Sequence, residues 1–321
     1  MKKRFVIILV FFLISLNSVA QTNELFKFVV ECDSLYKFKK YSEAIGLFKK
    51  GQNDQTDEFK YRMNDYYFIA CCYAQIKDKN NAFKNLFILL NKYDYSDTSI
   101  LKDTDLNNIN NDERWNEFKS GIIGNQKIND IKKSKYTYLK HKLDSLYRLD
   151  QIEAAYLNLE YQNKFDQRDK DSINKFVYKS AQDRSEEVSK LLKNTPWLDK
   201  SILGVDAFNM IFLSVQHSSD IKKMKKLLYE YKKNRRTPVE YAHYAMLYDR
   251  IQLFSNMKQR YGTQLIINLS TGKKFYHRIE DFNRINEYRK YCYYDTIQED
   301  MLWHKMHIYE ESTQVEQKNI K

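Results

Sequence analysis

Histidine, aspartate and arginine side chains in the second half of the chain are of the types that move protons and hold anions. His217 ends an apolar stretch, Asp249 is followed directly by Arg250, and Arg289 comes later. An imidazole can take up and return a proton near neutral pH, and a carboxylate can orient it. The sequence therefore suggests His217 and Asp249 as a candidate acid–base pair, with an arginine to hold an anionic group.

A polar turn and an acidic pair provide further candidate ligands. The run 259-QRYGTQ-264 offers two amides and a phenol beside a glycine that can end a helix. Two adjacent carboxylates follow the next apolar segment. The candidate ligand-binding residues are Arg250, Gln259, Tyr261, Gln264, Glu280, Asp281 and Arg289.

Three interpretations of these polar residues are open. They form a closed network that anchors a hairpin to helices, a ligand-binding pocket, or a catalytic site. Asp249 falls among apolar positions of its helix, and an unpaired buried charge costs several kcal/mol, so this carboxylate needs partners. The network is the preferred interpretation. Serine hydrolase, phosphate-loop and dinucleotide motifs are missing from the sequence.

A second set of possible metal ligands occurs near the end of the chain. Asp300, His304, His307 and Glu311 are spaced by four, three and four residues, so a helix over 296–311 would place them on one face. A solvated polar stripe of an amphipathic helix falls on the same face. Zinc sites usually take ligands from more than one element. We therefore expect neither a metal nor a cofactor.

Helices must position most of these groups. The sequence 237-TPVE-240 is a capping box with proline at the first helical position, so a helix begins at Pro238. Gly262 breaks the helical pattern, and 263–279 is typical of a β-hairpin. Apolar residues at helical spacing predict further helices over 136–166, 171–193, 205–217 and 221–236.

The first part of the chain contains an internal repeat. Residues 28–51 and 66–90 align when Ala44 is placed over Ala82, a period of 38 residues. Each unit predicts a helix pair with a small residue at its crossing, and 100–122 would cap the pairs. The pattern resembles tetratricopeptide repeats, which implies a concave surface for peptides or partner proteins. A module that only supports the rest of the chain is the alternative.

The second part of the chain, over about 140–295, resembles an uncharacterised domain family of exported bacterial proteins. The shared pattern is Gln-His, Asp-Arg, Gln-x-Tyr-Gly-Thr-Gln, an acidic pair and a final arginine. Two departures stand out: 291-YCY-293 replaces an expected Gly-Leu, and Ala154-Ala155 stand where an arginine is expected. The family has no established activity, so the resemblance implies a fold and a site but no chemistry.

The amino terminus predicts export. Three basic residues precede an apolar run over 5–16, and 18-SVA-20 fits signal-peptidase cleavage before Gln21. The product is expected in the periplasm or the medium, with no transmembrane anchor after cleavage. The net charge of +12 accompanies a general richness in Lys, Asn, Ile and Tyr, and an export signal argues against nucleic-acid binding. The four cysteines are more typical of buried thiols than of disulfides.

A mainly α fold follows from the scarcity of turn residues, with 7 Gly and 2 Pro in 321 residues. The expected function is an exported binding or scaffold protein that contacts a protein or peptide through its repeats. The alternative is a hydrolase-like periplasmic enzyme that uses His217 and Asp249. The predicted parts are a signal peptide (1–20), repeats with their cap (21–124), a linker (125–135), an α-rich domain with the hairpin (136–311) and a flexible tail (312–321).

Overall fold

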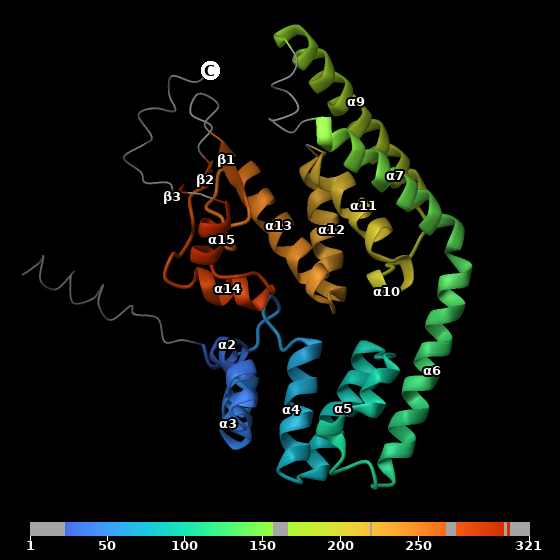
Figure 1. The fold of residues 1–321 in the computed structure, drawn as a ribbon, viewed down its shortest axis with the longest axis vertical. Helices are drawn as coiled ribbons and strands as arrows, with labels where there is room; N and C mark the ends of the chain where they lie inside the picture. The colour runs from blue at the N-terminus through green and yellow to red at the C-terminus, as the bar shows by residue number, and fades with distance from the viewer. Residues whose placement is uncertain (1–22, 157–165, 219, 268–273, 305–306, 309–321) are drawn as a thin grey trace, which may run out of the picture. The chain divides into compact units, whose positions relative to one another are not determined.

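The computed structural model describes residues 23–156, 166–218, 220–267, 274–304 and 307–308 (Figure 1). The predicted signal peptide and the tail over 312–321 lie outside the described residues. Contacts divide the chain into a first unit, Met1–Leu86 with Thr104–Asp112, and a second unit, Phe87–Asp103 with Glu113–Lys321. The fold is mainly α, as the composition predicts. Within the described residues, no helix has both the length and the apolar character needed to cross a membrane.

The first unit contains the helix pairs that the repeat predicts. They are α2 (Glu24–Lys37) with α3 (Tyr41–Gly51), then α4 (Met63–Gln75) with α5 (Lys79–Tyr93), which runs on into the second unit. Ala44 and Ala82 are 1% and 0% exposed, so both small residues lie at close packing positions. The two helix pairs are confirmed.

The turns inside the two pairs have the same backbone geometry. Lys39 and Lys77, one period apart, have φ angles of 57° and 63°, the left-handed conformation that ends many helices. The next amide closes each turn in the same way, Lys40 N to Leu35 O at 2.8 Å and Asp78 N to Tyr73 O at 2.9 Å. The 38-residue period is therefore present in the backbone as well as in the sequence.

Thiols and aromatic rings fill the interior. All four cysteines, Cys32, Cys71, Cys72 and Cys292, are buried and free, which confirms the thiol interpretation. Burial raises the pKa of Cys32 to about 12, so it stays protonated and unreactive at neutral pH. In the first unit the rings of Phe48 and Tyr61 stack at 4.3 Å, and the Tyr61 hydroxyl donates to the Phe48 carbonyl oxygen at 2.8 Å.

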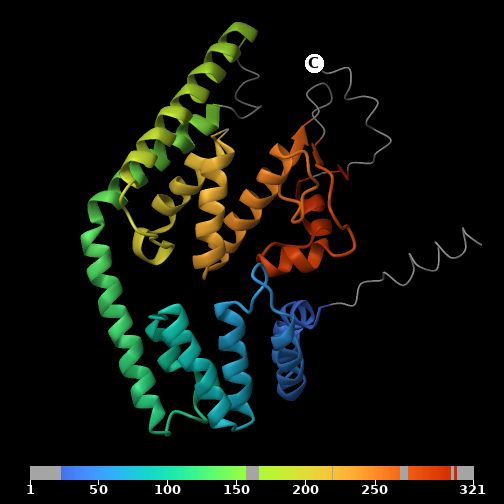
Figure 2. The ribbon, with the colours of Figure 1, turned by 180° about the vertical axis from the view of Figure 1, so that it is seen from behind.

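The second unit is a set of helices with a small sheet (Figure 2). Its strands β1 (Leu265–Ile267) and β2 (Lys274–Tyr276) pair antiparallel, which confirms the hairpin, and β3 (His307–Ile308) pairs parallel to β2. Helix α7 packs against α9 and α11, and α12 packs against α13. The described helices of this unit are α6 (Arg114–Lys135), α7 (Thr137–Tyr156), α9 (Gln167–Leu191), α10 (Lys200–Leu203), α11 (Val205–Gln216), α12 (Ile221–Asn234), α13 (Pro238–Phe254), α14 (Ile285–Tyr291) and α15 (Ile297–His304).

The segment 125–135, which the sequence analysis predicts to be a linker, forms the second half of helix α6. The division between the units also lies elsewhere, within α5 and around the segment 104–112. Gly121 lies inside α6. A Cβ at this position would overlap the side chain of Leu90, so the glycine serves close packing inside a helix and does not end one.

The predicted helix over 296–311 is also too long. Helix α15 ends at His304, and His307 belongs to strand β3, where it pairs with Phe275. The single helical face with four possible ligands is therefore not formed, and Glu311 lies outside the described residues. Strand pairing with β2 overrides the local helical spacing here.

Candidate functional site

The Asp249 carboxylate caps the turn that follows its own helix. Asp249 lies on α13 and is 0% exposed. Its Oδ1 accepts hydrogen bonds from the amides of Arg260 (2.7 Å) and Tyr261 (3.1 Å). Its Oδ2 accepts from the amide and the hydroxyl of Thr263, both at 3.0 Å. Four donors therefore surround a carboxylate that has no contact with solvent.

Burial and hydrogen bonding act on this carboxyl group in opposite directions. Burial raises the pKa of Asp249 from 3.8 to about 6, against the hydrogen bonds from Tyr261, Thr263 and Arg260, which lower it. The pKa of Asp249 is higher in the folded chain than in the unfolded chain, so ionisation of this carboxyl group opposes folding. Its contribution to the free energy of unfolding falls as the pH rises from about 4 to about 6. Arg250 does not offset that charge; its guanidinium lies 5.7 Å from the ring centre of Phe254.

Two glutamines close the turn. The Gln259 side chain donates to the carbonyl oxygens of Gln264 (3.1 Å) and His277 (2.7 Å) and accepts from the Gln264 amide at 2.9 Å. The Gln264 side chain in turn donates to the Met246 carbonyl oxygen on α13 at 3.3 Å. Gln264 also donates to the Thr263 hydroxyl at 3.3 Å, so the two side chains together tie the hairpin to the helix.

Arg289, from α14, holds the same turn from the other side. Its Nη1 donates to the carbonyl oxygens of Tyr261 and Gly262, each at 3.1 Å, and its Nε donates to Asp295 O at 2.7 Å. Its Nη2 pairs with Asp300 Oδ2 at 2.7 Å. Arg289 itself is only 1% exposed. The guanidinium is therefore occupied by protein groups and not open to an anionic ligand.

We call the set Asp249, Gln259, Tyr261, Thr263, Gln264 and Arg289 the Asp249 clamp. It is a buried network of hydrogen bonds that contains only some of the residues grouped in the sequence analysis. Besides Arg250, two candidates lie outside the clamp and serve local contacts. Glu280 pairs at the surface with Arg260 at 2.9 Å, and Asp281 accepts from the amides of Asn283 and Arg284 in a turn before α14.

Gly262 is required by the clamp in two ways, and its replacement tests the packing. Its φ of +64° disfavours a side chain, and a Cβ would lie 2.9 Å from Ile285 Cδ1. We expect Gly262→Ala to lower the free energy of unfolding by about 1–3 kcal/mol in urea denaturation. The matched control is Gly124→Ala in helix α6, where a Cβ meets nothing within 4 Å. There we expect a gain of roughly 0.5–1 kcal/mol, and equal effects at both sites would contradict this account.

His217 does not pair with Asp249. The predicted acid–base pair is therefore wrong, because the carboxylate beside His217 belongs to another residue. The imidazole Nδ1 lies 3.4 Å from Oδ1 of Asp150 on helix α7. The packing of α11 against α7 makes this pair, and spacing within one helix does not reveal it. A signal was present, since Asp150 continues the apolar stripe of Leu139, Leu143 and Leu146, where a carboxylate needs a partner.

A short chain of charges supports Asp150. Arg184 Nη2 donates to Asp150 Oδ1 at 3.1 Å, and its Nη1 donates to Glu153 Oε2 at 2.6 Å. Glu153 also accepts from the Ser180 hydroxyl at 2.7 Å. Burial alone would raise the pKa of Asp150, but the hydrogen bonds and charges of His217 and Arg184 hold it below its usual value. Asp150 therefore stays ionised beside the imidazole.

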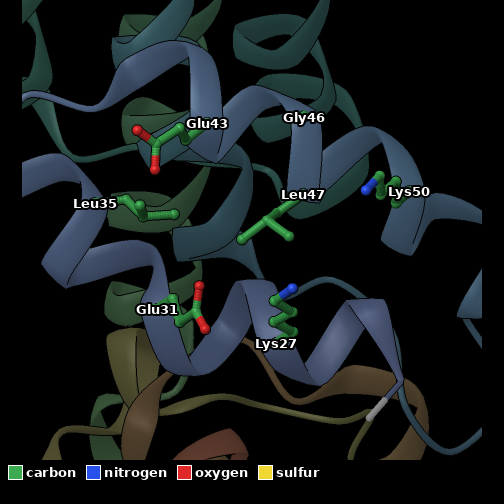
Figure 3. Close-up of a pocket in the computed structure, with 7 residues that line it drawn as sticks. All are labelled: Lys27, Glu31, Leu35, Glu43, Gly46, Leu47 and Lys50. Atoms are coloured by element: carbon green, nitrogen blue, oxygen red, sulfur yellow. The ribbon is translucent and has the colours of Figure 1, made fainter. Parts of the chain in front are cut away.

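A groove between α2 and α3 is a third candidate site, which the sequence interpretation did not assign. It has a cavity volume of about 290 Å3. Figure 3 shows Glu31 and Glu43 at one end, Lys27 and Lys50 at the other, and Leu47 between them. Leu35 and Gly46 complete its lining, and a Cβ at Gly46 would meet nothing within 4 Å. The groove therefore has an apolar middle and oppositely charged ends.

The charged ends of this groove differ in how they are paired. Glu43 forms an exposed ion pair with Lys40 at 3.1 Å. In the part of the chain that the structure describes, Lys27 and Lys50 have no carboxylate within ion-pair distance. Two lysines that line the same groove attract an anion.

Comparisons with known proteins give no match: no family model, no curated protein and no solved structure matches this sequence.

Proposed function

We propose that this chain is an exported binding protein that holds a peptide or protein segment in the groove between α2 and α3. The observation that carries the proposal is the charge-polarised groove with its apolar middle. An extended segment fits such a surface if an acidic group meets the lysines and a basic group meets the glutamates. Burying a leucine-sized side chain over Leu47 adds about 2 kcal/mol to binding.

The repeat architecture supports a binding role. Stacked helix pairs offer surfaces that in many repeat proteins contact extended partners. Both pairs here share one turn geometry, so the first pair, α2 with α3, is a regular repeat unit, and the groove lies between its two helices. Export is part of the proposal and rests on the basic and apolar residues at the amino terminus.

Affinity selection with a random-peptide phage library over the immobilised chain tests this function. The wild-type chain should enrich peptides in which an acidic and a basic residue flank an apolar one. Reversing the charge at the basic end with Lys27→Glu and Lys50→Glu should abolish this enrichment or invert its charge order, because the attraction becomes repulsion. We expect selected peptides to bind this double variant at least about 10-fold more weakly.

The matched control is Lys37→Glu with Lys49→Glu. These lysines are exposed on the same two helices and do not line the groove. The control variant should enrich the same peptides as the wild type. Two results would contradict the proposal that peptides bind in this groove. One is that the selected peptides show no charge pattern; the other is that they bind both double variants equally weakly.

A further inference from the structure

His217 contacts a buried carboxylate through one ring nitrogen, and its side chain is partly exposed. It is the C-cap residue of α11, and 38% of its side chain is exposed. Nδ1 contacts the buried Asp150 carboxylate, and among the described residues no hydrogen bond reaches Nε2. An Nδ1–H donated to a carboxylate leaves the Nε2 lone pair free for a proton.

The charged groups next to the imidazole favour its reversible protonation. Asp150 and Glu153 bring two carboxylates, and Arg184 brings one guanidinium. The cluster has an excess negative charge while the ring is neutral, and it becomes balanced when the ring takes up a proton. Asp150 itself is 3% exposed, so it can orient the ring but does not reach a substrate. An anionic substrate would be repelled by the same excess charge.

We propose that His217 is a general base with Asp150 as its positioning residue, at a site for an uncharged acyl compound such as an ester. A water on Nε2 gives its proton to that nitrogen while the water oxygen bonds to the carbonyl carbon. The proton then passes from Nε2 to the leaving oxygen as the carbon–oxygen bond breaks. Ester and water become acid and alcohol, and the imidazole returns to its neutral state.

The proposal is independent of peptide binding, since the groove lies in the other unit of the chain. Arg184 supports the pair from α9: its bonds to Asp150 and Glu153 fix both carboxylates. Arg184 is 5% exposed, and its Nε is buried without a hydrogen bond. Asp150 thus orients the imidazole, and Arg184 in turn fixes Asp150. General bases in proteins are commonly oriented by such a second set of contacts.

Hydrolysis of p-nitrophenyl acetate by the full chain tests the proposal, with release of p-nitrophenol as the signal. We expect His217→Gln to lower the protein-dependent rate at least 10-fold, at an unchanged melting temperature, because general-base catalysis contributes about 100-fold or more. The matched control is His141→Gln, which changes an exposed histidine on the same helix as Asp150. The control should keep the wild-type rate, and a His217→Gln variant that also keeps it overturns the proposal.

The role of Asp150 needs a readout that a purely structural residue would not move. We expect Asp150→Asn to lower the rate and to change its dependence on pH. If this variant does not fold, 15N chemical shifts of the wild-type imidazole give the answer. The neutral ring should be protonated at Nδ1 and unprotonated at Nε2. The reverse tautomer would show that Asp150 does not position His217.

Discussion

Asp249→Ala is expected to lower the free energy of unfolding by about 3 kcal/mol or more at pH 7. The substitution leaves the buried amide of Tyr261 and the partly buried amides of Arg260 and Thr263 without their acceptor. Each unpaired buried donor costs roughly 1–3 kcal/mol. Removing the buried charge gives back part of this loss, since burial disfavours the ionised carboxyl group, but three orphaned donors outweigh one desolvated acid. Urea denaturation followed by circular dichroism measures the difference.

A second carboxylate provides the control for this experiment. Asp281 also accepts two amide hydrogen bonds, but its turn is accessible to water. Asp281→Ala should therefore cost only about 1 kcal/mol, because water replaces the lost acceptor. If Asp249→Ala unfolds at the wild-type urea concentration, Asp249 has no structural role and the clamp is wrong.

Arg289→Ala should destabilise the chain by a similar amount, about 3–5 kcal/mol. The substitution removes donors from the carbonyl oxygens of Tyr261, Gly262 and Asp295 and breaks the ion pair with Asp300. It also leaves space where one of the largest fully buried side chains stood. Thermal unfolding of the variant at neutral pH measures the loss.

Two further variants separate geometry from charge. Arg289→Lys keeps the charge but cannot reproduce three differently directed bonds, so most of the loss should remain. Lys290→Ala changes the adjacent, partly exposed cation and should alter stability by less than about 1 kcal/mol. Full recovery with lysine at position 289 would mean that only the charge matters, against the hydrogen-bond geometry described above.

Local sequence patterns correctly predicted the elements that depend on interactions between residues close in sequence, such as helix caps and turns. The capping box places Glu240 where its carboxylate accepts from the amides of Thr237 and Arg236, and α13 begins at Pro238 as expected. The repeat period also follows from local chemistry, because the same helix–turn–helix recurs with the same buried alanine. Polarity was less informative: the lysine-rich segment 125–135 is helical despite its charge.

Partners across the fold were harder to predict. Gln259, Tyr261, Gln264 and Arg289 were among the proposed ligand-binding residues and lie in the clamp, but their spacing does not distinguish a clamp from a pocket. His217 was assigned to the wrong carboxylate because Asp150 reaches it through the packing of α7 and α11. The groove was missed altogether: Lys27 and Lys50 look like ordinary surface lysines until α2 and α3 lie side by side.

Amide hydrogen exchange at Tyr261 and Thr263 tests most directly whether the candidate motif is a structural clamp. If Asp249 accepts both amides in a closed network, they should exchange only when the surrounding fold opens. Their opening free energies should then lie within about 1 kcal/mol of that of the buried Leu247 amide on α13. Asp249→Asn should lower protection at both amides. Fast exchange at Tyr261 and Thr263 in the wild type, beside a protected Leu247, would contradict the clamp and reopen the turn as a binding or catalytic site.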